Sequence, residues 1–166
     1  MDYKNAQSGR SMVEMLGVIA IIGLISIGGI TSMGYVDSYF RVNSTLLEVD
    51  NLAANVADTY SWSDTYTDID LQEMCSEKAI KDCTENKQES GTTYSLENKW
   101  GGAITIAHEN SGASFSITYE KVPLVACQQI YDASLTPKTF HYVNLVSPQS
   151  EEGCTNESTL KFELRQ

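Results

Sequence analysis

A long apolar stretch from Met12 to Ile30 contains a single charged residue, Glu14, close to its beginning. A helix of about 20 apolar residues, rising about 1.5 Å per residue, is long enough to cross a lipid bilayer. A carboxylate in hydrocarbon is costly, so something in its surroundings must offset that cost. The sequence therefore predicts a membrane-length helix in which Glu14 has a particular task.

The residues before this stretch do not form an ordinary secretory signal. In a secretory signal, the small residue at the cleavage site follows the apolar core. Here the candidate cleavage site, between Gly9 and Arg10, precedes the apolar core. Cleavage would remove residues 1–9 as a polar leader and would leave the apolar helix on the mature chain.

The residues around this site resemble the type IV pilin family, which includes the pseudopilins of type II secretion. The matching residues are Gly9 and the string Ser11-Met12-Val13-Glu14-Met15-Leu16. In that family a prepilin peptidase cuts after the glycine, and a glutamate is the fifth mature residue, as Glu14 is when counted from Arg10. The family usually begins with Phe, Met or another apolar residue instead of arginine, so methylation of the new amino terminus stays open.

The resemblance implies a structural subunit, a major pilin. Such a subunit is held in the bacterial inner membrane with a periplasmic head domain and is then assembled into an extracellular pilus. Its partners would be its own copies in a helical filament, minor pilins, the prepilin peptidase and the inner-membrane assembly platform. In the filament core, Glu14 would pair with the amino terminus at Arg10 of a neighbouring subunit, because an uncompensated charge there is costly.

Three other interpretations stay open. The chain could be a minor pilin or a type II secretion pseudopilin, which would share the leader and the helix. It could be a membrane-anchored adhesin or sensor domain that never polymerises. It could also carry a plain N-terminal anchor in which Glu14 is incidental. An uncleaved leader and a monomeric membrane fraction would favour the anchored interpretations.

The apolar segment, residues 10–33, is expected to continue as an amphipathic helix over residues 34–62. Its apolar residues recur at alternating steps of three and four, which is typical of a helix that buries one narrow stripe. The stripe consists of Tyr39, Val42, Leu46, Val49, Ala53, Val56 and Tyr60. We expect this stripe to pack against the globular head, residues 63–166.

Within the head, residues 62–91 lack a sustained period and are predicted to form a surface loop region with a short helix over 71–80. A second helix is predicted to start at Pro123. The predicted strands, of which the first two form a hairpin, are residues 104–108, 114–119, 139–146 and 159–164. The predicted fold class is α+β, a long N-terminal helix packed on a small antiparallel sheet, as in the type IV pilin fold.

All of the chain's 4 cysteines lie in the head. An even number of cysteines in a domain carried into an oxidising compartment indicates disulfides. Three pairings are open, and the favoured one joins Cys75 to Cys83 and Cys127 to Cys154. A zinc site is the alternative, but the sequence has no Cys-x-x-Cys pair and its two histidines stand alone.

A second resemblance covers the head. The segment Asn98–Gly102, a strand pair, Val122-Pro123 and Cys127 are similar to the type IVb-like major pilins of thin conjugative and related pili. In those pilins, a cysteine after the Val-Pro pair and a cysteine near the C terminus close an outer region with a disulfide. Cys127 and Cys154 fit these positions.

No arrangement of residues predicts an enzyme, a cofactor site or a metal site. The sequence contains no Gly-x-Ser-x-Gly motif and no glycine-rich phosphate loop ending in Lys-Ser or Lys-Thr. Asp64, Asp68 and Asp70 could offer oxygens to calcium, but their spacing does not match the helix-loop-helix calcium pattern. The net charge of −11 argues against direct binding to a nucleic-acid backbone, which needs clustered Lys and Arg.

Overall fold

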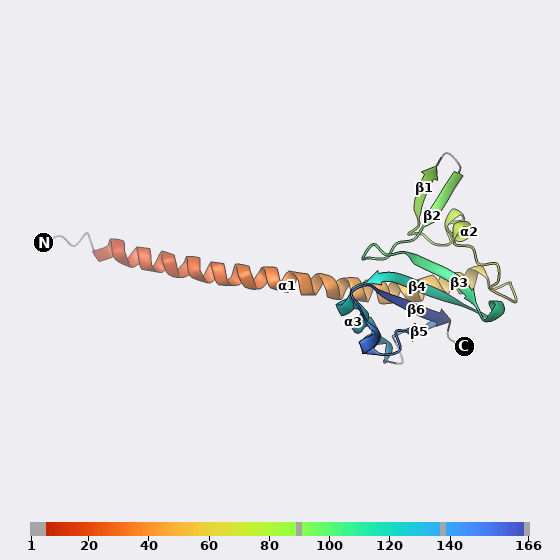
Figure 1. Cartoon of the computed structure of the whole chain (residues 1–166). Helices are drawn as coiled ribbons and strands as arrows, with labels where there is room; N and C mark the ends of the chain where they lie inside the picture. Colours follow the sequence, from red (N-terminus) through yellow and green to blue (C-terminus); the bar gives the residue numbers. More distant parts are fainter. Residues whose placement is uncertain (1–5, 89–90, 137–138, 165–166) are drawn as a thin grey trace. The chain divides into compact units, whose positions relative to one another are not determined.

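The computed structural model describes residues 6–88, 91–136 and 139–164. Side chains are described from residue 12 onward, except over residues 27–35. The chain divides into two compact units, Met1–Phe40 and Arg41–Gln166, and each is described by itself. In Figure 1 the described part of the first unit is helical, and the second contains helices and strands.

The first element is the long helix α1, Ala6–Thr59, which ends at Thr59 instead of the predicted residue 62. The predicted apolar segment, residues 10–33, lies in α1. The side chains of residues 10, 11 and 27–33 fall outside those that the structure describes. Over the described residues, no helix has an apolar stretch long enough to cross a membrane.

In the second unit, α1 buries one side against the head. The α1 residues in the hydrophobic core are Val42, Val49, Leu52, Ala53 and Val56. Leu46 and Tyr60 are partly buried and pack against this core. The predicted stripe is therefore confirmed from Val42 to Tyr60, whereas Tyr39, in the first unit, is exposed.

The head contains a four-stranded antiparallel sheet in the order β3-β4-β6-β5. Its strands are β3 Ile104–Glu109, β4 Ser114–Val122, β5 Val143–Ser147 and β6 Ser158–Leu164. Phe115, Ile117 and Tyr119 of the central strand β4 are fully buried, and Ile117 pairs with Phe162 of β6. The predicted hairpin and the α+β fold class are both confirmed, because a long helix and an antiparallel sheet share this core.

Helix α3, Leu124–Ser134, follows β4 directly and begins after Pro123, as predicted. Strand β5 begins at Val143 and not at Thr139 as predicted. Phe140 is buried instead, with its ring centroid 5.4 Å from that of Phe162. The preceding segment packs into the core and does not join the ladder, which shortens the strand.

The predicted surface loop region contains a β-hairpin that was not predicted from the sequence. After α2, Leu71–Ser76, the chain forms a two-stranded hairpin of β1, Thr84–Gln88, and β2, Gly91–Ser95. All of β1 and most of β2 are exposed. Because the side chains on both faces are polar, the segment has no alternation of apolar and polar residues to reveal it.

Candidate functional site

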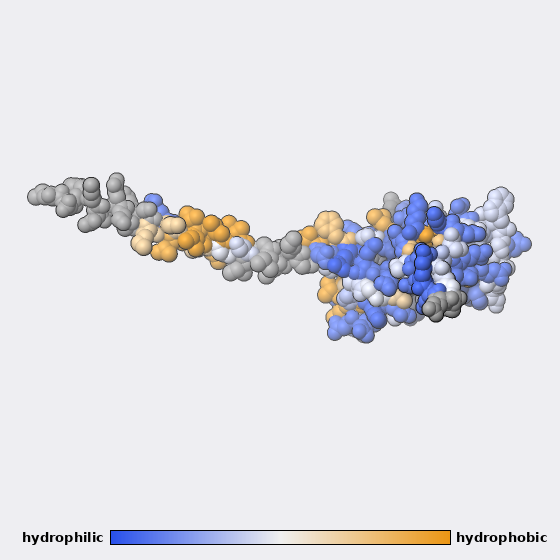
Figure 2. Space-filling view, turned by 90° about the horizontal axis from the view of Figure 1, so that it is seen from above, coloured by the Kyte–Doolittle hydropathy of each residue, from blue (hydrophilic) through white to orange (hydrophobic). Residues whose placement is uncertain are grey.

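The described part of α1 in the first unit carries a continuous apolar surface. Met12 and Leu24 are each 72% exposed. The other large apolar side chains exposed in this stretch are Val13, Met15, Leu16, Val18, Ile19, Ile21, Ile22 and Ile25. In Figure 2 the hydrophobic colour covers much of this segment. An apolar surface of this extent in a single chain marks a site of association with another protein or a membrane.

Glu14 lies in this apolar segment and is exposed. The backbone of Gly9 and Arg10 belongs to α1, but their side chains lie outside those described. The Ser26 hydroxyl donates a hydrogen bond to the Ile22 carbonyl at 2.8 Å, so this polar group is satisfied within its own helix. A carboxylate accepts hydrogen bonds, and inside a helix the backbone N–H groups are already bonded to carbonyls. In an apolar environment Glu14 therefore needs a partner outside its own helix.

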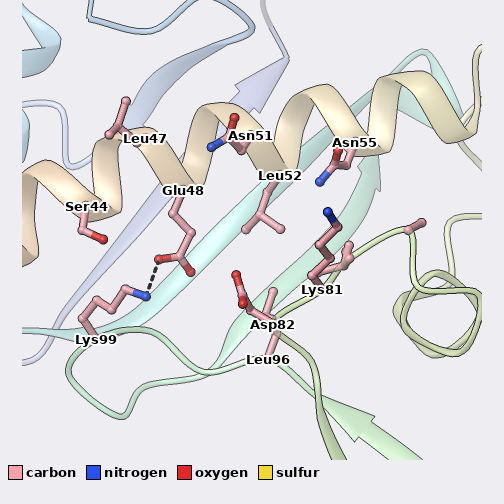
Figure 3. A pocket seen from close by; sticks show the side chains of 12 residues that line it. Ser44, Leu47, Glu48, Asn51, Leu52, Asn55, Lys81, Asp82, Leu96 and Lys99 are labelled. Atoms are coloured by element: carbon pink, nitrogen blue, oxygen red, sulfur yellow. Dashed lines mark ion pairs between the residues drawn. The ribbon is translucent and has the colours of Figure 1, made fainter.

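A groove of about 460 Å³ runs beside α1 in the second unit. One wall is α1, from Ser44 to Asn55, and the other is formed by residues 79–82, Leu96 and Lys99. Figure 3 shows Glu48 of α1 paired with Lys99 of the opposite wall, and the Glu48 Oε2 to Lys99 Nζ distance is 3.4 Å. The pair connects α1 with the loop that precedes the sheet.

The Glu48 carboxylate lies in an electrostatically unfavourable position in the wall of this groove. Its side chain is only 14% exposed, and burial raises its pKa above the usual value, while Lys99 partly opposes the shift. At 3.4 Å from Lys99 Nζ, Glu48 Oε2 is too distant for a short hydrogen bond. Asp82, also on the groove wall, raises the pKa of Glu48 further. The ionised carboxylate is therefore poorly stabilised.

Lys99 is positioned by a turn that the buried Asn98 side chain organises. Asn98 Oδ1 accepts hydrogen bonds from the backbone N–H groups of Trp100 and Gly102, and Asn98 Nδ2 donates to the Glu120 carbonyl at 2.6 Å. At Gly102 an added Cβ would lie 1.8 Å from the Glu120 carbonyl oxygen. The segment Asn98–Gly102 is thus a tight turn packed directly on the end of β4.

The cysteines form two disulfides, Cys75–Cys83 and Cys127–Cys154, each with 5.8 Å between Cα atoms. This is the pairing favoured from the sequence. Cys75–Cys83 connects α2 to the start of the β1–β2 hairpin. Cys127–Cys154 connects α3 to the residue after the short 3₁₀ helix Glu151–Gly153.

A carboxylate of α1 holds the segment between α3 and β5. Asp50 Oδ1 accepts hydrogen bonds from the backbone N–H groups of His141 and Tyr142, at 2.9 and 3.0 Å. Asp50 Oδ2 lies 3.0 Å from His141 Nδ1. The disulfide-closed region and α1 are therefore joined by a specific polar contact as well as by the core.

The three aspartates considered as calcium ligands, Asp64, Asp68 and Asp70, do not form a metal site among the described residues. Asp70 is the N-cap of α2, where its Oδ1 accepts a hydrogen bond from the Gln72 N–H at 2.8 Å. Across the described parts of the chain, no three side chains of His, Cys, Asp or Glu gather in a way that could hold a metal ion.

Comparisons with known proteins agree with this architecture. A family model described as PilS N terminal matches residues 40–159. The solved structure of a type IV b pilin from Salmonella typhi superposes with a TM-score of 0.51 and 21% identity, over 70% of this chain and 95% of that chain. No curated protein matches the sequence significantly.

The solved structure supports the fold, and the family match covers most of the chain. Both describe pilins, which are structural subunits and not enzymes. We conclude that the chain belongs to the PilS N-terminal family of type IV pilins.

Proposed function

We propose that the chain is a major pilin, cleaved after Gly9 and polymerised through the apolar part of α1. The observation that carries this proposal is the exposed apolar surface over residues 12–26, with Glu14 as its one charged residue. Each large apolar side chain that becomes fully buried contributes about 1.5–3 kcal/mol. Ten such side chains on one short segment provide a strong drive to bundle with identical helices.

Glu14 would set the axial register of the bundle. Cleavage would create a positive amino terminus at Arg10, and a neighbouring subunit's Glu14 would pair with it. Hydrophobic contacts alone are non-directional, so helices could slide along one another at little cost. A buried carboxylate left without its partner costs several kcal/mol, on the order of 3–5 kcal/mol, which disfavours every other register.

Before assembly, the subunit would be held in the inner membrane, with its head in the periplasm. The prepilin peptidase, the assembly platform and minor pilins would be its partners in processing and polymerisation. The acidic head, in a chain of net charge −11, would face water on the outside of the fibre.

The proposal predicts that Glu14→Ala leaves the amount of cellular pilin unchanged but sharply reduces the amount in sheared fibres. Glu157→Ala, at an exposed turn position in the head, is the matched control and should assemble normally. Immunoblots of sheared and cell-bound fractions measure both. Normal fibre yield from Glu14→Ala would contradict the pairing role. A wild-type chain present in fibres only in traces would indicate a minor pilin.

A further inference from the structure

The β1–β2 hairpin has one blocked edge and one open edge. The blocked edge belongs to β2, where the Gln72 side chain bonds Tyr94 as a neighbouring strand would. Gln72 Nε2 donates to the Tyr94 carbonyl at 2.7 Å, and Gln72 Oε1 accepts from the Tyr94 N–H at 2.6 Å. Figure 1 shows the hairpin as a projection from the head, with α2 beside it.

The contact with Gln72 fixes which backbone groups point outward from β1. Tyr94 turns its N–H and C=O away from β1, so the pair Glu85↔Tyr94 is a non-hydrogen-bonded pair of the ladder. By alternation, Asn86 bonds inward to Thr93, while Glu85 and Lys87 direct their N–H and C=O groups outward. Among the described residues, no hydrogen bond engages these outward groups.

We propose that the open edge of β1 pairs with β1 of a second copy of this chain, antiparallel about a two-fold axis that runs midway between the two copies of Asn86. In this register Glu85 lies opposite Lys87 of the second copy, and Lys87 lies opposite its Glu85. The outward N–H and C=O groups of both residues then meet complementary groups, as an antiparallel narrow pair requires.

The charges of β1 favour a second β1 strand as the partner, and they favour this register. Glu85 and Lys87 lie on one face of β1, and their side chains already form an ion pair at 3.6 Å. In the dimer the two copies bring together four charges of alternating sign on that face. Opposite charges directly across an antiparallel pair are stabilising, and like charges are destabilising. A shift of register by two residues would remove the opposition of Glu85 and Lys87.

The pairing is isologous and therefore closed. It joins two heads and does not extend into a chain of subunits, so it differs from the polymerisation proposed for α1. The β1–β1 pairing does not depend on cleavage after Gly9, so the two proposals can fail separately.

This register places the two copies of Asn86 directly opposite each other across the axis, which gives a direct test. In a non-hydrogen-bonded antiparallel pair the two Cα atoms lie about 4.5 Å apart, within the range that a disulfide can bridge. Asn86→Cys in the full chain, purified in detergent, should form a reductant-sensitive dimer. Thr93→Cys lies on the same face one strand farther from the axis, so its two copies would be about 14 Å apart, and it should remain monomeric.

The charges supply the second arm of the experiment. In the Asn86→Cys background, Lys87→Glu should abolish the dimer because two acidic side chains then lie opposite each other. Adding Glu85→Lys exchanges the two charges and should restore the dimer. Cross-linking no greater than that of Thr93→Cys would overturn the proposal. So would a dimer that persists in Lys87→Glu or fails to return after the charge exchange.

Discussion

At the scale of single residues, the turn between Asn98 and Gly102 shows how two residue types position a third, Lys99. Asn98 is buried, and its side-chain amide makes three hydrogen bonds to backbone groups, those of Trp100, Gly102 and Glu120. Gly102 allows the turn to touch the Glu120 carbonyl. Lys99, carried by the same turn, then reaches Glu48 of α1. The Asn-Lys-Trp-Gly-Gly segment therefore has a structural role: it holds Lys99 in the groove wall opposite α1.

Gly102→Ala should destabilise the head strongly, because its Cβ would overlap the Glu120 carbonyl oxygen at 1.8 Å. We expect the free energy of unfolding to fall by about 3 kcal/mol, the upper part of the range for overpacking. Gly101→Ala is the control, since it meets no atom within 4 Å and suffers only from its positive φ of 77°. Chemical denaturation measures both, and a larger loss at Gly101 would refute this account of the turn.

Glu48→Gln should stabilise the head at neutral pH. The folded-state pKa of Glu48 is raised, mainly by burial, so the folded chain binds this proton more tightly than the unfolded chain does. Its ionised form therefore lowers stability at neutral pH, and stability recovers as the pH falls through the raised pKa toward 4.5, the ordinary pKa of a glutamate. In the variant Lys99 loses its charged partner, but its side chain is 43% exposed and stays hydrated, so this loss costs little.

Thermal unfolding between pH 4.5 and 7 tests this prediction. The variant should have the higher Tm at pH 7, and the difference should shrink as the pH falls. Glu157→Gln, at an exposed position in a turn, should leave the Tm unchanged. A lower Tm for Glu48→Gln at pH 7 would show that the ion pair with Lys99 outweighs the burial of the carboxylate.

At the scale of elements, apolar periodicity predicted what packs against the core. The stripe on α1, the β3–β4 hairpin and α3 each carry a regular apolar pattern because each buries one side. The β1–β2 hairpin carries none, since its residues are mostly exposed on both faces. The one local signal was the run Thr92-Thr93-Tyr94 after Gly91, whose residue types favour strands.

The groove and the Asp50 contact could not be predicted from the sequence for a different reason. Glu48 and Lys99, like Asp50 and His141, are far apart in the chain, and no sequence pattern links the two members of either pair. Their meeting depends on how the elements pack. By contrast, Gly9, Glu14 and the apolar segment form a local pattern, which is why the resemblance to pilins is visible in the sequence.

The two disulfides should differ in their effect on stability. In the chain-entropy model, the Cys127–Cys154 bridge, with a sequence separation of 27, contributes about 3.5 kcal/mol. Cys75–Cys83, with a separation of 8, contributes about 2.5 kcal/mol. Paired Cys→Ala variants measured by chemical denaturation should keep this order. The reverse order would mean that the region between α3 and β5 is held chiefly by the core and by Asp50.

At the scale of the whole molecule, two kinds of surface have two tasks. The apolar residues 12–26 are suited to lie among other apolar helices, and the charged head is suited to water. A single chain with such an exposed apolar segment is incomplete without a membrane or further copies. This division agrees with the proposed pilin, whose apolar segment would lie in a membrane before assembly and among other copies of α1 afterwards.

The amino terminus of the native polypeptide tests this account most directly. Mass spectrometry of the chain purified from its own cells should show a first residue at Arg10, which makes Glu14 the fifth residue and frees a positive amino terminus. Gly9→Val should block this cleavage, keep residues 1–9 on the chain and prevent fibre formation. A native chain that still begins at Met1 would contradict the account.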